Sequence, residues 1–381
     1  MTQYQDAFYP GAVSAGVREC ARRWDLIERL LPTSGMVLDV GSNLGYFGVR
    51  MALRSEQIGV VSIESNQVNA EEQARIVRSH KLTRVCVINA AFGSQVSRDW
   101  VRACDWFDMT MLLSIIHWFD DPAQVVRDLS SMSARMIIEV PDADDRGACG
   151  QTHLQEWRDP LEWVRNTTHR TCTLIGRGDR HTSEAASHII LVEGAVSRKP
   201  VVAYWDSQYV HPQGSDYEVT YDGHHMDLAI RGQRCDYTPG VNLLSLMKLG
   251  RLVWPAPQYW VRSGIDEIRR STGHRDPVPH NMIWTPSGIQ LIDGNDRRGD
   301  AVGRAAERVL RRNVRAWRKN MLSSPSAYIP RRSALERNVA KWRKQVRKGT
   351  RSLAARVLPA PLAQRLKRLF PYRGEGGNTS Q

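Results

Sequence analysis

Residues 36–48, MVLDVGSNLGYFG, constrain the fold of this chain more than any other stretch. The apolar run Met36–Val40 is typical of a buried parallel strand. Gly41 and Gly45 then predict a tight turn into a helix over Tyr46–Arg54. Glycine at these two positions lets the backbone approach a ligand where a Cβ would collide. The stretch therefore predicts a strand, a ligand-binding turn and a helix.

A second strand follows at the distance expected for a βαβ unit. Gly59–Ile63 is apolar and is followed by Glu64, whose carboxylate can accept both hydroxyls of a ribose, as in dinucleotide-binding units. The alternation continues with expected helices over 67–79, from Asp121-Pro122 and over 154–166, and with expected strands over 85–89, 107–113, 135–140, 172–176 and 188–193. This pattern predicts an α/β fold, a doubly wound, Rossmann-like parallel sheet with its ligand at the carboxyl ends of the strands.

The motif and its spacing resemble those of class I S-adenosylmethionine-dependent methyltransferases, and DVGSNLGYF is similar to the form in the FkbM-like branch. The resemblance covers roughly residues 35–195 and departs from the commoner family pattern at Asn43, where a third glycine is usual. It implies that S-adenosylmethionine is the cofactor. The methionine part would face the glycine loop, the ribose would bind the acid after the second strand, and the adenine would border the end of the third. The implied cofactor-binding residues are Asp39, Gly41, Ser42, Asn43, Gly45, Glu64, Asn89, Ala90 and Ser114.

Two other interpretations of the motif stay open. An NAD-binding oxidoreductase would use GxGxxG, which this stretch does not complete. The other is a methyltransferase-like fold that no longer binds its cofactor.

Catalysis is expected where the segment Leu112–Phe119 leaves the fourth strand. Methyl transfer is an in-line displacement, in which the protein positions two reactants and removes a proton. His117 is the candidate general base for a hydroxyl acceptor, because imidazole ordinarily titrates near neutrality. The alternative is a histidine that only hydrogen-bonds a loop. Glu139 and Asp142, after the fifth strand, are either acceptor contacts or solvated acids.

A second motif lies far along the chain. The stretch HRDPVPHN, residues 274–281, has Asp276 and Asn281 at the D-x4-N spacing of kinase catalytic loops, and Asp293 follows twelve residues after Asn281. Residues 282–291 between them are expected to form a β-hairpin. The segment resembles the C-lobe of protein-kinase-like and aminoglycoside-phosphotransferase-like folds. The resemblance implies that Asp276 is catalytic and that Asn281 and Asp293 bind Mg²⁺ together with ATP.

The remainder of a kinase is hard to find. No glycine-rich phosphate loop precedes the motif, Arg231 stands where the kinase lysine is expected, and only 45 residues separate Arg231 from Asp276. We therefore interpret residues 199–301 as a shortened α+β kinase-like domain that is degenerate or acceptor-binding. A methyltransferase followed by such a segment resembles the bifunctional kinase-methyltransferases that cap bacterial O-antigen chains. That resemblance favours a glycan or glycolipid acceptor.

The basic residues are concentrated near the C-terminal end. The net charge is +13, but residues 302–381 hold 21 Lys and Arg against three acids, a charge of +18, and the remainder carries −5. Val339, Trp342 and Val346 recur along one side of an expected helix in this tail. A basic amphipathic helix of this kind binds anionic membrane surfaces. The alternatives are a solvated tail, disordered at its end, and a tail that binds nucleic acid.

These observations divide the chain into a methyltransferase domain over 1–198, the kinase-like domain over 199–301 and the basic tail over 302–381. No signal peptide and no apolar run of about 20 residues is evident. The six cysteines are scattered, which favours a reducing cytoplasm over a disulfide framework or a zinc site. We expect a cytoplasmic O-methyltransferase of polysaccharide biosynthesis, peripheral at the inner membrane face. The alternatives are a bifunctional methyltransferase-kinase and an RNA-directed methyltransferase that uses the tail.

Overall fold

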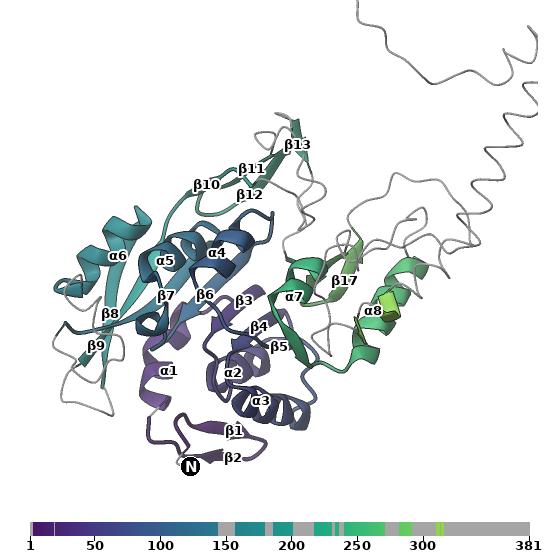
Figure 1. The fold of residues 1–381 in the computed structure, drawn as a ribbon, viewed down its shortest axis with the longest axis horizontal. Coiled ribbons are helices and arrows are strands. Elements are labelled where there is room, and N and C mark those ends of the chain that lie inside the picture. The colour runs from purple at the N-terminus through teal and green to yellow at the C-terminus, as the bar shows by residue number, and fades with distance from the viewer. Residues whose placement is uncertain are drawn as a thin grey trace, which may run out of the picture. The chain divides into compact units, whose positions relative to one another are not determined.

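Eight strands form the central sheet of the computed structural model, in the order β15-β5-β4-β3-β6-β7-β9-β8 (Figure 1). Their bounds are β3 Gly35–Val40, β4 Ile58–Glu64, β5 Val85–Asn89, β6 Phe107–Leu112, β7 Ser133–Pro141, β8 Thr171–Asp179, β9 Ala186–Glu193 and β15 Arg251–Trp254. The five strands β3 to β7 are parallel, and they are mostly apolar because helices cover both faces of such a sheet. The strand order reverses between β3 and β6, which is where doubly wound sheets bind ligands.

The structure describes residues 3–18, 20–143, 157–179, 186–200, 217–230, 233–235, 240–270, 282–291, 310–312 and 314–315. The chain divides into two compact units, 1–329 and 330–381, and all of the described residues belong to the first. The predicted kinase residues Asp276, Asn281 and Asp293 lie outside the described residues, and so does the tail beyond residue 315.

The edges of the sheet depart from the parallel arrangement. β9 runs antiparallel to both β7 and β8. Only residues 180–185 connect β8 to β9, too few for the crossover helix that a parallel neighbour needs. β15 runs antiparallel to β5, with Arg251 opposite Asn89. The prediction of a parallel sheet is therefore confirmed for β3 to β7 and wrong for β9, and β15 was not predicted.

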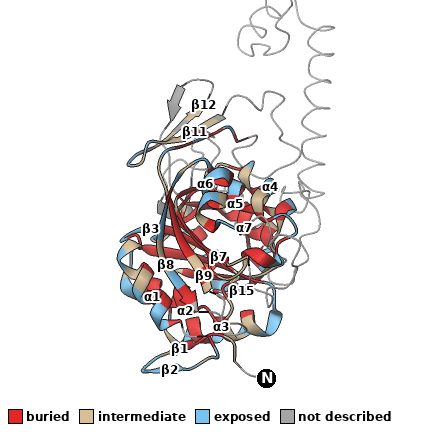
Figure 2. Ribbon diagram, turned by 90° about the vertical axis from the view of Figure 1, so that its left-hand side faces the viewer, coloured by how far each residue is buried: buried red, intermediate tan, exposed pale blue. Residues whose placement is uncertain are grey.

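Helices cover both faces of the sheet, and Figure 2 shows the strands buried between them. α1, α2 and α3 share one core cluster with the strands, and α4, α5 and α6 share another. The helices are α1 Ala21–Ile27, η1 Glu28–Leu30, α2 Tyr46–Arg54, α3 Gln67–Ser79, α4 Ser94–Val101, η2 Ile116–Trp118, α5 Pro122–Ser131, α6 Pro160–Thr168, α7 Leu243–Leu249 and α8 Pro257–Arg270. α2 and α3 have the predicted bounds.

The helix expected over residues 154–166 begins later than predicted and ends later, because α6 spans Pro160–Thr168. Its start is set by Asp159, whose side chain accepts a hydrogen bond from the backbone N–H of Glu162. Proline is favoured at the first helical position, where its missing N–H is not needed. The start of α6 is thus explained by capping chemistry that the apolar periodicity did not reveal.

Three smaller sheets complete the described chain. Their strands are β1 Ala7–Tyr9 with β2 Ala12–Ser14; β10 Val196–Arg198, β11 Tyr217–Tyr221, β12 Met226–Ile230 and β13 Gln233–Cys235; and β14 Val241–Asn242 with β16 Met282–Thr285 and β17 Gly288–Leu291. β16 and β17 form the predicted hairpin, with Met282 opposite Leu291. Side chains from Val241 to Ile289 join the core cluster of the central sheet, so this segment packs against that sheet. None of the described helices is long and apolar enough to cross a membrane.

Candidate cofactor-binding site

The strand order brings the predicted cofactor-binding residues to one edge of the sheet. Asp39 lies near the end of β3, Glu64 ends β4 and pairs with Asn89 at the end of β5, and Ser114 follows β6. Because β3, β4, β5 and β6 are parallel neighbours, their carboxyl ends meet on the same side. The predicted set that shares this edge is Asp39, Gly41, Ser42, Asn43, Gly45, Glu64, Asn89, Ala90 and Ser114.

The loop after β3 has a backbone conformation that few residues adopt. Gly41, Asn43 and Gly45 have φ angles of 73°, 51° and 78°. Asparagine enters this left-handed region more readily than most residues, so Asn43 is compatible with the turn although the family pattern more often has glycine. The backbone N–H groups of Gly41 and Ser42 both donate to the carbonyl oxygen of Ile63, at 2.8 and 3.1 Å. The loop is therefore tied to the end of β4.

The structure corrects the reason given for the two glycines. A Cβ on Gly41 would lie 2.8 Å from Cδ1 of Ile115, and a Cβ on Gly45 would collide with the side-chain amide of Gln73. These positions are occupied by the protein's own side chains rather than kept open for a ligand. Glycine is required here by the positive φ angles and by the close packing of Ile115 and Gln73.

Glu64 links the glycine loop to the start of α3. Its side chain is buried, and its two oxygens accept hydrogen bonds of 2.7 Å from the backbone N–H groups of Asn43 and Asn66. Burial raises the pKa of Glu64, and the N–H groups of Asn66 and Asn43 oppose that rise. The backbone N–H and the hydroxyl of Ser65 also bond this carboxylate and oppose the rise. A ribose hydroxyl that binds here would replace the Ser65 hydroxyl as a donor.

Asp39 is a second buried acid beside Glu64. Burial, and then repulsion by Glu64, raise the pKa of Asp39 from 3.8 to about 7. Its Oδ2 atom is buried without a hydrogen-bond partner in the described part of the chain. An unpartnered carboxylate oxygen in a protein interior is costly. The pair of acids therefore makes this corner of the sheet favourable for a ligand that carries positive charge.

The end of β5 is fixed to the end of β4. Asn89 donates from its side chain to the carbonyl oxygens of Glu64 and Ser65, at 2.9 and 3.0 Å, and the backbone N–H of Ala90 donates to the Glu64 carbonyl oxygen. Gly250 packs directly against Ala90, because a Cβ on Gly250 would lie 2.5 Å from the Cβ of Ala90. The segment before β15 thus borders the residues predicted to lie beside the adenine.

His117, the predicted general base, lies in η2 just after β6. Its side chain is buried, and its ring centroid is 5.5 Å from that of Trp118, whose residue is 62% exposed. η2 begins two residues after Ser114, so His117 belongs to the same edge of the sheet as the glycine loop. The position is compatible with a base beside the acceptor, and the structure does not test that role.

Glu139 and Asp142, predicted to be acceptor contacts or solvated acids, both have partners within the protein; Glu139 lies in β7 and Asp142 follows it directly. Glu139 is fully buried; it pairs with Arg18 and Arg23, and it accepts from Ser187 Oγ at 2.5 Å. Asp142 is bonded to the His188 ring and accepts from the backbone N–H of Ala186. The prediction of Glu139 as a solvated acid is wrong, because two arginines neutralise it inside the protein. Arg18 and Arg23 were missed: isolated arginines near a chain end carry no periodic signal.

The predicted metal site is not among the described residues. Asn281 and Asp293 lie outside them, and within the ranges that are described no group of three His, Cys, Asp or Glu side chains could hold a metal ion. A cavity of about 640 Å³ lies at the opposite edge of the sheet, between α8, the β16–β17 turn and residues that precede β4 and β5. It is separate from the glycine loop.

Comparisons with known proteins give distant structural likenesses. No family model matches the chain, and no curated protein matches it. The bifunctional kinase-methyltransferase WbdD is 16% identical over 78% of this chain and 81% of its own, with a TM-score of 0.38. The N-terminal domain of EvdMO1, solved in the presence of SAH and D-fucose, is 12% identical over 50% of this chain and 91% of its own, with a TM-score of 0.37.

A third similar structure is a putative O-methyltransferase from Nostoc punctiforme PCC 73102, 14% identical over 45% of this chain and 54% of its own, with a TM-score of 0.33. Likenesses with such low identities and TM-scores do not assign an activity to this chain.

Proposed function

We propose that this chain transfers a methyl group from S-adenosylmethionine to a hydroxyl group. The observation that carries the proposal is the corner formed by β3 and β4. There a left-handed glycine loop meets two buried acids: Asp39, whose Oδ2 has no partner among the described residues, and Glu64. The corner lies beside the point between β3 and β6 where the strand order of the doubly wound sheet reverses. Ligands of such sheets bind at this point.

The chemistry of these residues fits the donor. S-adenosylmethionine carries a positive sulfonium and a positive ammonium group, and the two buried carboxylates favour positive charge. A ribose hydroxyl would replace the Ser65 hydroxyl as a donor to the Glu64 carboxylate. Asn89 and Ala90, held to the end of β4, would border the adenine. When bound, the donor supplies an electrophilic methyl group.

The remaining work of the protein is to orient the acceptor and to remove its proton. His117 is the residue we assign to proton removal. It is buried beside the exposed Trp118 at the end of β6, next to the donor corner. As the acceptor oxygen bonds to the methyl carbon and the carbon–sulfur bond breaks, its proton would pass to the imidazole.

We place the acceptor among bacterial surface glycans or glycolipids. This choice is supported by the sequence order, in which a methyltransferase motif precedes a kinase-like motif and a basic tail. The tail would hold the enzyme at an anionic membrane surface. Comparing the methylated glycans of a deletion strain with those of its parent tests the choice, because the loss of one methyl ether identifies the acceptor. Unchanged glycans would remove it.

Isothermal titration tests the donor. The wild-type protein is expected to bind S-adenosylmethionine, and Glu64→Gln is expected to bind at least about tenfold more weakly, because an amide accepts fewer hydrogen bonds and has no charge. Asp99→Asn, an exposed acid on α4, is the matched control and should bind as the wild type does. Absence of binding by the wild type would refute the proposal.

Phosphotransfer is a second candidate activity, favoured by one described feature. β16 and β17 pair with Met282 opposite Leu291, and the predicted Mg²⁺ ligands Asn281 and Asp293 stand within two residues of these paired ends in the sequence. This hairpin follows α8 and the predicted catalytic-loop motif in the order that a kinase C-lobe has. Mg²⁺-dependent ATP binding that Asp293→Ala abolishes would support this activity, and no thermal shift with MgATP would exclude it.

A further inference from the structure

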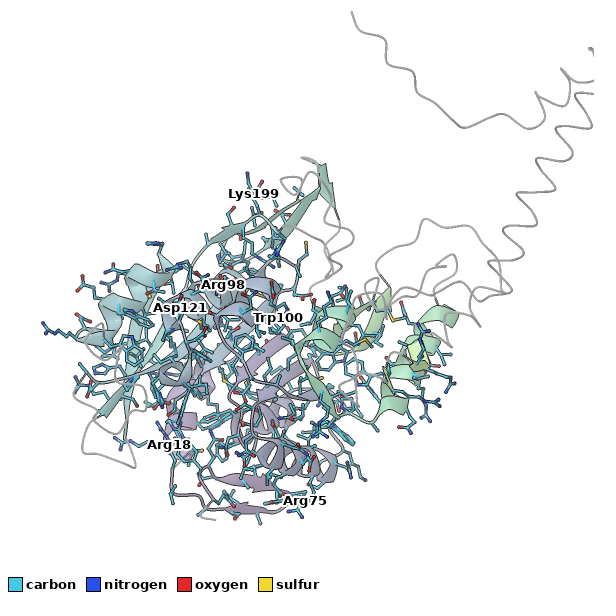
Figure 3. All side chains as sticks on the ribbon, in the orientation of Figure 1. Arg18, Arg75, Arg98, Trp100, Asp121 and Lys199 are labelled. Carbon is cyan, nitrogen blue, oxygen red and sulfur yellow. The ribbon has the colours of Figure 1, made fainter. Side chains whose placement is uncertain are left out.

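Arg18 connects the N-terminal segment to the ends of β6 and β7. Its side chain is 1% exposed. One terminal nitrogen donates to Ser114 Oγ at 2.6 Å and to the Tyr4 hydroxyl at 3.0 Å, and the other pairs with Glu139. Figure 3 labels Arg18 beside α1, on the N-terminal part of the chain. A residue far from the glycine loop in sequence thus contacts the strand end that borders it.

Ser114, the residue that Arg18 contacts, has an unfavourable backbone conformation. Its φ angle is 57°, in the left-handed region that residues other than glycine rarely adopt. Such conformations persist where surrounding contacts hold them in place, and they concentrate at functional sites. The hydrogen bond from Arg18 reaches the side chain of this same residue and opposes its relaxation.

The conformation of Ser114 determines where the next residue lies. Ile115 follows directly, and its Cδ1 and Cγ1 atoms lie 2.8 Å from the place where Gly41 would carry a Cβ. The side chain of Ile115 is therefore seated against the glycine bend that begins the donor corner. A continuous series of contacts runs from Arg18 through Ser114 and Ile115 to Gly41.

We propose that Arg18 is a positioning residue of the donor site. It holds Ser114 in the left-handed conformation and so keeps Ile115 against the Gly41 bend. Loss of this contact lets the segment after β6 relax, and the wall of the donor corner loses its shape. The inference rests on the proposed function, because it assumes that S-adenosylmethionine binds at this corner.

A purely structural role for Arg18, as a partner of Glu139, makes different predictions. Arg23 is the matched comparison, since it is also buried and bonds the other oxygen of Glu139, at 3.3 Å, together with Cys20 Sγ. If the ion pair with Glu139 were all that mattered, Arg18→Met and Arg23→Met would have the same effect on donor binding. If Arg18 acts through Ser114, only Arg18→Met weakens it.

The test combines titration with S-adenosylmethionine and amide hydrogen exchange of residues 112–118. Arg18→Met is expected to bind the donor roughly tenfold more weakly. This factor corresponds to the free-energy cost of the left-handed conformation for a residue other than glycine. It should also exchange faster over 112–118, and Arg23→Met should do neither. Adding Ser114→Gly to Arg18→Met should recover at least about half of the lost binding free energy, because glycine adopts the left-handed conformation without support.

Ser114→Ala covers the case in which Arg18→Met does not fold. It removes the acceptor oxygen and leaves the pair of Arg18 with Glu139 intact, and it is expected to show the same faster exchange and weaker binding. The proposal would be overturned if Ser114→Ala had wild-type affinity and exchange. It would also be overturned if Arg18→Met and Arg23→Met lost binding equally and Ser114→Gly recovered none of it. If the wild type binds no donor, the proposed function fails, and the exchange measurement still decides whether Arg18 holds Ser114.

Discussion

Asp39 combines burial with a neighbouring acid, and its pKa of about 7 lies well above the ordinary 3.8. A group whose pKa is higher in the folded state stabilises the fold most below its unfolded pKa. That contribution is lost as the pH rises toward the folded pKa. The wild type is therefore expected to lose stability between pH 5 and pH 8 relative to Asp39→Asn, by up to about 3 kcal/mol.

Urea unfolding of both proteins at the two pH values measures this difference, with Asp99→Asn as the control for an exposed acid. The free energy of unfolding of Asp39→Asn should increase relative to that of the wild type only as the pH rises. A difference that is the same at pH 5 and pH 8 would show that the Asp39 carboxylate is not perturbed.

A comparison of Gly41 with Gly11 separates two reasons for requiring glycine, namely a positive φ angle and a lack of space for a Cβ. Both have positive φ angles, 73° and 76°, but a Cβ on Gly11 would meet no atom of the described residues within 4 Å, whereas one on Gly41 would press on Ile115. Gly11→Ala should cost about 1 kcal/mol for the backbone alone. Gly41→Ala should cost about 2–4 kcal/mol, because overpacking is added. Equal losses in urea unfolding would contradict the contact with Ile115.

At the residue scale, the sequence predicted which residues gather at this edge of the sheet, but not the side chains that contact them. The motif from Asp39 to Gly45 and the position of Glu64 could be predicted because a strand, its turn and the next strand leave recognisable local patterns in the sequence. The burial of Asp39 and the contact between Arg18 and Ser114 both depend on segments that are far apart in the chain. No spacing rule predicts such contacts, because they depend on how the N-terminal segment folds over the strand ends.

Among the elements, the strands and helices of the alternating region were predictable because their apolar runs are long and regular. α2 and α3 have the predicted bounds. β15 was missed, since Arg251–Trp254 is a short strand at the sheet edge with three partly exposed positions, and short edge strands give a weak pattern. The antiparallel direction of β9 follows from a short connection rather than from the strand itself.

β15 supplies a prediction about how the chain folds. Leu252 is 1% exposed and belongs to the core cluster of the central sheet. Leu252→Ala should lower the free energy of unfolding by about 2–5 kcal/mol. It should also keep a single unfolding transition, because the segment and the sheet share one core. Leu53→Ala on α2, where the leucine is 44% exposed, is the control. Two separate transitions would mean that the segment folds independently.

At the scale of the whole molecule, positive charge is concentrated near the C-terminal end. Residues 330–381 are the second of the two units and hold 14 Lys and Arg against two acids. Removing them should leave binding of S-adenosylmethionine unchanged and abolish binding to phosphatidylglycerol vesicles. Vesicle binding by the full chain should weaken as salt rises, because ions screen the attraction. Vesicle binding by the shortened chain would contradict a role of residues 330–381 in membrane attachment.

A methyl donor that binds where β3 and β4 end would protect that corner from solvent, and amide hydrogen exchange with and without S-adenosylhomocysteine measures this protection. We expect slower exchange over residues 39–45, 64–66 and 89–91, with no change in α8 or the β16–β17 hairpin. Protection confined to other parts of the chain, or no protection at a saturating ligand concentration, would contradict binding at this corner.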